Sequence, residues 1–409
     1  MAKLTDKIFY VENEQLFYDW KKIEKIPEFA VLKKCEQNPR WHSEGTAWQH
    51  TVKVCEAMEK KLSRNAYKQR PYETKLLMTA ALFHDIGKGV TTQFKKGNWH
   101  AYNHEVEGER LTRRLLWNEG YEFREQTCGL VRWHMDPLRV FESDKGILEK
   151  IARLSKCTNI KYLCMLKDCD IIGSHQAPES STSEEDRAKI VDLQNIARHL
   201  GCISKPLCVP LNGKYPWKKV KDKRTPIQVY VMVGLPGAGK DTLIDNILVD
   251  DLLDNAFDYY RNVMPTTPPD NTVILSRDNI RVDLGFCKSN EKIVGTKYQE
   301  EKVTKVFNDM LKEALDNGKN IVVDAINIKK EYRVRLIESL ASYNTVINYV
   351  YVEAEGLDTN IGRRHGQIDK KVFQDMTERF EFPTYEEYDN LYVFINNNEQ
   401  GWIQKPDTL

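Results

Sequence analysis

The spacing of apolar residues is helical in the first half of the chain and strand-like in the second. Over residues 44–200 the apolar positions recur mainly at helical intervals, and few β-branched runs interrupt them. Two such faces are formed by Leu76, Leu77, Ala80, Ala81 and Phe83, and by Leu111, Leu115 and Leu116. The pattern therefore predicts an all-α domain over residues 1–200.

Over residues 227–409, short β-rich runs alternate with helical patterns. These runs lie at residues 227–233, 272–276, 320–325 and 345–354. The alternation predicts an α/β domain with a mainly parallel sheet. Residues 201–226 carry four Pro, two Gly and a basic run, which favours an interdomain linker. Residues 250–270 are longer than a usual loop and are interpreted as an insertion.

The charge balance excludes a protein that wraps a nucleic-acid duplex. The chain has 61 Lys and Arg against 60 Asp and Glu, so any contact with nucleic acid is expected to be local. Its 9 Cys include no Cys-x-x-Cys pair and are expected to be reduced thiols. The first residues lack a signal pattern, and no apolar stretch is long enough to cross a bilayer. We therefore expect a cytoplasmic protein without membrane contact, whose oligomeric state stays open.

A glycine-rich loop follows the first predicted strand and precedes a helix, which is the setting that a P-loop requires. Its backbone N–H groups surround phosphate oxygens, and Lys240 supplies a cation between the β- and γ-phosphates. The sequence therefore predicts binding of ATP with Mg²⁺. The expected nucleotide-binding residues are Gly234, Gly237, Ala238, Gly239, Lys240, Asp241 and Thr242. Asp241 stands where the motif has a Ser or Thr ligand of Mg²⁺, so either Thr242 binds the ion, Asp241 holds it through water, or Asp241 is only a helix N-terminal acid.

Polar residues stand where the later strands of the α/β domain end, the edge at which such sheets bind ligands. Asp278 follows the second strand, and a carboxylate there can accept the proton of an attacking hydroxyl. Arg281 lies on the following turn, where it can hold a phosphate beside that hydroxyl. Asp324 and Asn327 follow the third strand. Arg363 lies beyond the fourth strand, where a lid arginine can neutralise charge on the transferred phosphate.

These elements resemble the polynucleotide 5′-hydroxyl kinases over roughly residues 227–380. The similarity rests on the runs GLPGAGKDT, RDNIR and DAIN and on an Asn-x-x-Arg in the lid. It implies that Asp278 is the general base, that Arg281 holds the acceptor phosphate and that Arg363 contacts the transferring phosphate. The chain departs from the family after the loop lysine and at Ile326, where a Thr is common.

A His-Asp pair at the end of an apolar helix indicates a metal site in the first domain. His84 and Asp85 can bind one divalent ion if further ligands come from other helices. The candidates on other helices are His50 and Asp170, with His104 and His134 to complete or extend the site. Nitrogen and oxygen ligands together suit Mn, Fe, Co, Ni or Zn, and the sequence specifies neither the metal nor whether one or two ions bind.

This order of residues resembles the HD phosphohydrolase superfamily. The resemblance implies as metal ligands His50, His84, Asp85 and Asp170, with Asp168 as the alternative to the last. Lys88 and His104 are then expected to contact the scissile phosphate, and His134 to do the same or to bind a second metal ion. Related domains often carry Arg at the position of Ser174, which puts one phosphate contact in doubt. His100 lies in a run that could be a loop and is left outside the site.

As a whole, the chain resembles the bifunctional HD-domain polynucleotide kinases of bacterial RNA repair. That resemblance implies an enzyme that phosphorylates 5′-hydroxyl ends with an NTP and hydrolyses 2′,3′-cyclic, 2′ or 3′ phosphates. RNA is expected over DNA, and a ligase is the expected functional partner.

Two alternatives remain. One is a nucleoside or nucleotide kinase fused to a nucleotidase, and the other is a nucleotide-sensing regulator. Asp278 argues against the regulator, because a sensor needs no general base.

Overall fold

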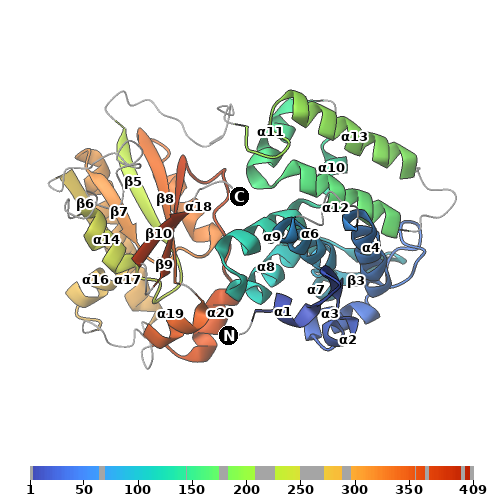
Figure 1. Cartoon of the computed structure of the whole chain (residues 1–409). Helices are drawn as coiled ribbons and strands as arrows, with labels where there is room; N and C mark the ends of the chain where they lie inside the picture. The colour runs from blue at the N-terminus through green and yellow to red at the C-terminus, as the bar shows by residue number, and fades with distance from the viewer. Residues whose placement is uncertain are drawn as a thin grey trace. The chain divides into compact units, whose positions relative to one another are not determined.

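The computed structural model describes residues 3–63, 70–143, 145–174, 183–207, 226–248, 271–287, 296–354, 356–363, 368–397 and 401–405. The chain divides into two compact units, Met1–Asn212 with Thr408–Leu409 and Gly213–Asp407 (Figure 1). The expected insertion at 250–270 and most of the expected linker lie outside the described residues. The described start of the linker packs on the first unit, where the Lys161 N–H donates to the Ile203 carbonyl at 2.9 Å.

The first unit consists mainly of helices, which confirms the predicted all-α character. Its longer helices are α4 (Ala47–Leu62), α6 (Pro71–Phe83), α8 (His104–Leu115), α9 (Tyr121–Trp133), α11 (Ile147–Cys157), α12 (Ile160–Gly173) and α13 (Ser183–His199). Its short helices are α1 (Thr5–Ile8), α2 (Trp20–Ile23), α3 (Pro27–Ala30), η1 (Val31–Lys34), α7 (Lys88–Thr91), η2 (Trp117–Glu119) and α10 (Asp136–Arg139).

Helix α6 lies in the core of the first unit. Every residue from Leu76 to Phe83 is buried, and α4, α9 and α12 all pack against the helix. The single apolar face predicted here is therefore too narrow, because a helix enclosed by other helices buries its whole circumference. Since α6 ends at Phe83, the buried pair His84 and Asp85 is placed at the end of this core helix.

Two β-hairpins accompany these helices. Strand β1 (Phe9–Glu12) pairs with β2 (Gln15–Tyr18), and β3 (Thr92–Lys95) pairs with β4 (Asn98–Ala101), both antiparallel. Lys96 and Gly97 connect β3 to β4 with φ values of 49° and 79°. A two-residue turn with positive φ at both positions matches the twist of the flanking strands. The β3–β4 hairpin therefore forms a regular projection between α7 and α8.

The second unit contains one six-stranded sheet with the order β10-β9-β8-β5-β7-β6. Its strands are β5 (Ile227–Val233), β6 (Thr272–Ser276), β7 (Asn320–Asp324), β8 (Thr345–Ala354), β9 (Asn390–Asn397) and β10 (Gly401–Lys405). All pairings are parallel except that of β10 with β9, which confirms the predicted α/β class. Its helices are α14 (Lys240–Leu248), α16 (Arg277–Asp283), α17 (Lys297–Asp316), α18 (Lys330–Ser339), α19 (Leu357–Arg363) and α20 (Lys370–Glu378).

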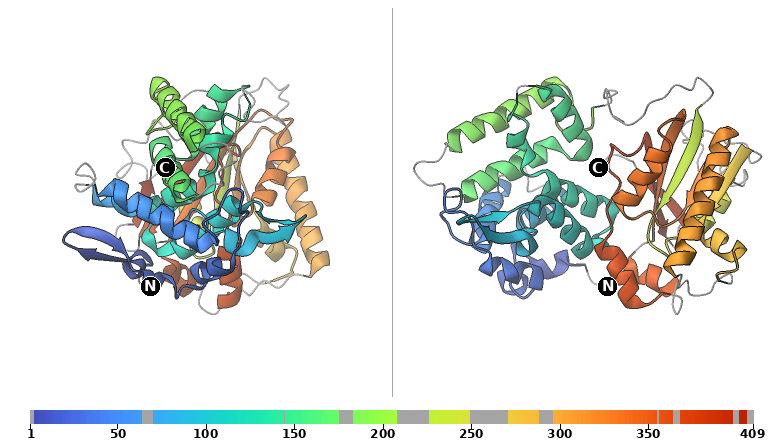
Figure 2. Two further views of the ribbon diagram at one scale, coloured as in Figure 1. Left: turned by 90° about the vertical axis from the view of Figure 1, so that its right-hand side faces the viewer. Right: turned by 180° about the vertical axis from the view of Figure 1, so that it is seen from behind.

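Strand β5 occupies the middle of this sheet, between β7 and β8. Its Val229, Val231 and Val233 are fully buried. Helix α17 packs on β6 and β7, as the rear view in Figure 2 shows. Because β5 is central, the glycine-rich loop that follows it opens at the middle of the carboxyl edge of the sheet, where α/β sheets bind ligands.

Among the described helices, none is long and apolar enough to cross a membrane. The eight cysteines in the described ranges are all free, and six of these are buried.

Candidate active sites

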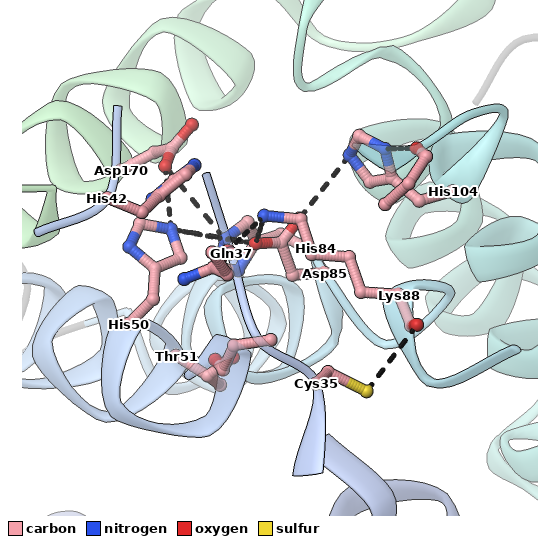
Figure 3. Close-up of polar contacts among 12 residues, drawn as sticks. Cys35, Gln37, His42, His50, Thr51, His84, Asp85, Lys88, His104 and Asp170 are labelled. Atoms are coloured by element: carbon pink, nitrogen blue, oxygen red, sulfur yellow. Dashed lines mark hydrogen bonds and ion pairs between the residues drawn. The ribbon is translucent and has the colours of Figure 1, made fainter. Parts of the chain in front are cut away.

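Four histidines and two aspartates meet in the interior of the first unit. His50 comes from α4, His84 and Asp85 follow the end of α6, and Asp170 comes from α12, so helices distant in sequence supply the group (Figure 3). His104 begins α8 and His134 follows the end of α9. All six side chains are buried.

The orientation of each imidazole is fixed by its Nδ1 atom. In His84, His104 and His134 this nitrogen lies 2.8, 2.9 and 2.8 Å from the backbone carbonyl three residues earlier. A carbonyl oxygen only accepts, so Nδ1 carries the proton and the Nε2 of each neutral ring presents a lone pair. The Nδ1 of His50 faces the Glu44 carboxylate at 2.9 Å, with the same consequence. All four Nε2 atoms are therefore available as ligands.

The first group of ligand atoms lies around the Nε2 of His50. This atom is 2.9 Å from Asp170 Oδ1, 3.2 Å from the Nε2 of His84 and 3.6 Å from Asp85 Oδ2. The expected four ligands are thus brought together. Asp168, the alternative to Asp170, instead forms an ion pair with Lys61 and is 25% exposed in its side chain.

The second group lies on the other side of Asp85. Its Oδ1 is 3.4 Å from the Nε2 of His104 and 3.8 Å from that of His134, and these two nitrogens are 3.3 Å apart. Asp85 therefore offers one oxygen to each group of histidines.

Both groups suit divalent transition-metal ions. Two imidazole nitrogens with lone pairs facing each other at 3.2 or 3.3 Å repel unless a cation or a proton lies between them. Within each group the ligand atoms of three residues lie within 4.8 Å of one another. Neutral imidazole with carboxylate is the donor set that such metals prefer, and the Nδ1 partners supply the orienting hydrogen bonds usual for metal-binding histidines.

Charges around the group favour ionised carboxylates. Burial opposes the charge on Asp85, but Lys88 and His84 outweigh it and hold the pKa of this carboxyl well below its usual range. The Lys88 Nζ lies 2.7 Å from Asp85 Oδ2 and donates to Gln37 Oε1 at 2.7 Å. The lysine expected to meet the phosphate thus lies against Asp85, an expected metal ligand, and its contact with substrate stays a prediction.

The histidines differ in their affinity for protons. Burial lowers the pKa of His50, but hydrogen bonds to Asp170 and Glu44 overcome this and raise it to about 9. Burial lowers the pKa of His104, and burial together with the neighbouring His104 lowers that of His134. The carboxylates therefore hold one positive charge at His50, in the form of a proton or of a metal ion in its place.

In the second unit, the P-loop wraps closely around its own lysine. Gly234 passes so near to β8 that a Cβ atom at this position would lie 2.2 Å from the Val352 carbonyl oxygen. Gly237 and Gly239 have φ values of 77° and 96°. The buried Lys240 Nζ donates to the carbonyls of Gly234 at 3.0 Å and Leu235 at 3.2 Å. The loop has the conformation in which backbone N–H groups can surround phosphate oxygens.

A pocket of about 310 Å³ opens at this loop. It is lined by Gly237, Gly239, Lys240, Asp241, Thr242, Arg363 and Asn396. Arg363 donates to the Gly237 carbonyl at 3.1 Å and to Asn396 Oδ1 at 3.3 Å. The arginine expected in the lid therefore lies against the phosphate loop. The neighbouring Arg364 and His365 lie outside the described residues.

Acidic side chains gather beside the same pocket. Burial, followed by the charge of Asp241, raises the pKa of Asp324, and Asp278 adds to this while Ser276 and Lys240 oppose it. Asp324 ends β7 directly opposite Ser276 at the end of β6. Asp241 and Thr242 both line the pocket, so the choice of Mg²⁺ ligand between them stays open.

Asn327, the other residue predicted at the end of this strand, supports the start of the P-loop. Asn327 donates to the Met232 carbonyl at 2.7 Å and has a φ of 44°. The Ile326 carbonyl accepts the Gly234 N–H at 3.0 Å. The DAIN run thus holds the start of the P-loop in place.

Asp278 and Arg281 lie on one face of α16 and contact each other. Arg281 donates to Asp278 Oδ1 at 2.5 Å and, through two nitrogens, to the Glu300 carboxylate at 2.8 and 2.9 Å. Glu300, which lies on α17, stands in no motif that would have selected it from the sequence. Glu300 fixes the guanidinium, while the Asp278 side chain remains 69% exposed.

Comparisons with known proteins define the class of each unit. Residues 47–193 match the family model of the HD domain, and residues 229–383 match that of an AAA domain. The protein therefore contains an HD domain followed by a P-loop domain, as predicted, and the matching family model describes the second as an AAA domain. These domains support a metal-dependent hydrolase and a kinase as the two activities.

More specific relatives are distant. No curated protein matches the chain. A chain in "Structure of Pnkp1/Rnl/Hen1 complex" is 20% identical with a TM-score of 0.26, and the match covers 37% of this chain and 43% of that chain. A chain in "Structure of the Pnkp1/Rnl/Hen1 RNA repair complex" is 18% identical with a TM-score of 0.28, over 40% of this chain and 50% of that chain. The match thus spans half or less of these chains.

Proposed function

We propose that this protein heals broken polynucleotide ends, preferably of RNA, by adding a phosphate at the 5′ end and removing one at the other end. The observation that carries the proposal is the exposure of Asp278. Its side chain is 69% exposed and stands at the carboxyl edge of the sheet. It is close enough to Asp324, beside the nucleotide pocket, to help raise the pKa of that carboxyl. A hydroxyl on the end of a long strand can reach such a base, whereas a nucleoside kinase encloses its acceptor.

In the kinase domain, each residue then has a definite part. Lys240 leaves the loop carbonyls and interacts with the β- and γ-phosphates of ATP or another NTP bound with Mg²⁺. Asp278 accepts the proton of the 5′-hydroxyl as its oxygen attacks the γ-phosphorus. Arg281, held by Glu300, binds the phosphate next to that hydroxyl, and Arg363 neutralises charge on the transferred group.

In the HD domain, His50, His84, Asp85 and Asp170 would hold one transition-metal ion, drawn from Mn, Fe, Co, Ni or Zn. Because the Nε2 atoms of His104 and His134 face each other, these two residues with Asp85 would hold a second ion rather than contact the phosphate directly. Bound metal would acidify a water molecule and polarise a phosphoryl oxygen. Lys88 lies beside Asp85, where it would also attract the phosphate of the substrate.

The proposed substrates of the HD domain are 2′,3′-cyclic, 2′ or 3′ phosphates. Their removal leaves a 3′-hydroxyl, and the kinase leaves a 5′-phosphate. Those are the two groups that a nucleic-acid ligase joins, so a ligase is the proposed functional partner.

A single incubation tests both halves of this proposal. The protein is given ATP, Mg²⁺, a transition metal and a short RNA with a 5′-hydroxyl and a 2′,3′-cyclic phosphate, and both ends are analysed. We expect a 5′-phosphate and a 3′ end without phosphate. Phosphorylation of a mononucleoside in preference to the RNA would contradict the proposal and favour a nucleoside kinase fused to a nucleotidase.

A further inference from the structure

The β3–β4 hairpin and the turn that follows it present two stacked rings that belong to neither group of candidate metal ligands. The ring centroids of His100 and Tyr102 are 5.1 Å apart, and their planes differ by 7°. Tyr102 is 60% exposed. His100, which lies in a run that the sequence allowed to be a loop, is part of β4. The outer surface of the stack is therefore open to a planar ligand.

Both ends of the hairpin adjoin residues at the HD centre, the buried group of four histidines and two aspartates in the first unit. At one end β3 directly follows α7, which begins at Lys88, the residue whose Nζ lies 2.7 Å from Asp85. At the other end the Ala101 carbonyl accepts the Nδ1 proton of His104 at 2.9 Å. Tyr102 lies between these two residues, and two residues of chain span at most about 7 Å. The backbone of Tyr102 is therefore close to that of His104.

The hairpin face that carries His100 is suited to a polyanion. Gln93 pairs directly with His100, and Lys95 lies two residues further along β3, so these three side chains project from the same face. Residues 86–104 include three lysines and no acidic residue. Stacked rings together with cations are the combination with which proteins bind single-stranded nucleic acid.

We propose that Tyr102 stacks on the base of the nucleotide whose phosphate enters the HD centre, and that Lys95 attracts the backbone of the same strand. This inference rests on the proposed function, because it states how that site holds a polynucleotide end. Every base has a π-face, so such a contact accepts ends of any sequence.

The opposite face of the hairpin provides a matched control. Phe94 is 58% exposed and packs edge-on against Trp99, with 5.1 Å between the ring centroids. It pairs directly with Trp99, so it projects from the face opposite to that of His100. Phe94→Ala thus removes an exposed ring from the same hairpin without touching the proposed stack.

The test is a binding measurement that does not require turnover. The ligand is a short RNA with a 5′-phosphate, which blocks the kinase acceptor, and with 2-aminopurine as the 3′-terminal base carrying a 3′-phosphate. Stacking on an aromatic ring quenches the fluorescence of this base. We expect Tyr102→Ala to abolish most of the quenching and to raise the Kd by about 5- to 30-fold. Tyr102→Phe and Phe94→Ala are expected to bind like the wild type.

The outcomes separate this inference from the proposed function. If Tyr102→Ala quenches and binds like the wild type, or if Phe94→Ala weakens binding as much, the stack is wrong whatever the enzyme hydrolyses. Release of phosphate from the same RNA is measured in parallel with added transition metal. Quenching that depends on Tyr102 without any phosphate release would uphold the stack and contradict the proposed hydrolysis. An unchanged thermal unfolding midpoint confirms that each variant is folded.

Discussion

The histidines of the HD centre obtain their orientation from the helices that they terminate. His84 and His134 occupy the C-cap positions of α6 and α9, and each Nδ1 donates to a carbonyl of the last helical turn. Those carbonyls have no partner within their own helix. One hydrogen bond therefore completes the helix end and turns Nε2 toward the interior, so the fold itself prepares the ligand.

Removal of one such ligand is expected to release the metal. His84→Ala deletes an Nε2 that lies 3.2 Å from the Nε2 of His50. We expect the affinity for transition metal to fall by more than about tenfold. Elemental analysis of the purified protein measures this, with His199→Ala as the control because His199 is exposed at the end of α13. Equal metal content in the two variants would remove His84 from the ligand set.

The sequence predicted the residues that would react or bind ligands better than it predicted the residues that orient them. The His-Asp pair and the P-loop lysine stand in sequence motifs whose residue spacing is required by the chemistry of the site. Glu44 and Glu300 stand in no such motif, although Glu44 orients His50 and Glu300 fixes Arg281. Their partners lie on other segments of the chain, and only the folded structure brings them within hydrogen-bonding distance.

At the scale of elements, helices α8 and α9 are joined by a buried ionic group. Arg113 on α8 contacts Glu125 on α9 at 2.7 Å, and Arg124 contacts the same carboxylate at 2.7 Å. Burial opposes the charge on Glu125, but Arg113 and then Arg124 outweigh it and lower its pKa. Since α8 begins with His104 and α9 ends before His134, this group also fixes the spacing of those two histidines.

Glu125→Gln is expected to destabilise the first unit in a pH-dependent manner. The folded-state pKa of Glu125 is lowered, so its contribution is fully present above the usual glutamate pKa and is lost as the pH falls through the folded value. At neutral pH the variant leaves two buried arginines without their carboxylate, at a cost of about 3–5 kcal/mol. Thermal unfolding at neutral and at acidic pH measures the difference, which should shrink in acid. The exposed Glu122→Gln on the same helix is the control.

The P-loop depends on a close approach between two elements. A Cβ at Gly234 would lie 2.2 Å from the Val352 carbonyl, so Gly234→Ala must push the loop away from β8. We expect loss of ATP binding and a fall in the free energy of unfolding by about 1–3 kcal/mol. Equilibrium titration with MgATP and chemical denaturation measure these effects. A Cβ at Gly362 meets nothing within 4 Å, so Gly362→Ala is the control and should bind ATP normally.

Helices and strands with a clear hydrophobic pattern were predictable from the sequence. Elements whose form depends on contacts with other segments were not. All four expected strands are present, and three of them, β8, β5 and β7, lie inside the sheet, where unbroken apolar runs are required. Strands β9 and β10 and both hairpins, β1–β2 and β3–β4, were missed. In β3–β4 the alternation of polar and aromatic residues covers only about three positions in each strand, too few to predict a strand, and its regular shape comes from the Lys96-Gly97 turn. The enclosure of α6 likewise depends on three other helices.

At the scale of the whole molecule, the two reaction centres draw on separate parts of the chain. The candidate HD residues from His50 to Asp170 all lie in the first unit, and the kinase residues from Gly234 to Arg363 all lie in the second. The core of the first unit runs to Cys202, whereas the second has its own core around Tyr230. Each centre is thus supported by its own unit, and the two catalysts should be separable.

The final prediction is that each activity can be removed alone. Asp278→Ala deletes the base for the 5′-hydroxyl, and kinase activity should fall by about 10²–10⁴-fold while phosphate removal continues. Asp85→Ala deletes the carboxylate that faces both groups of histidines, and hydrolysis should stop while 5′ phosphorylation continues. Both ends of one RNA are assayed for each variant, with circular dichroism to confirm folding. If either folded variant loses both activities, the centres must be coupled, because no candidate residue is common to the two units.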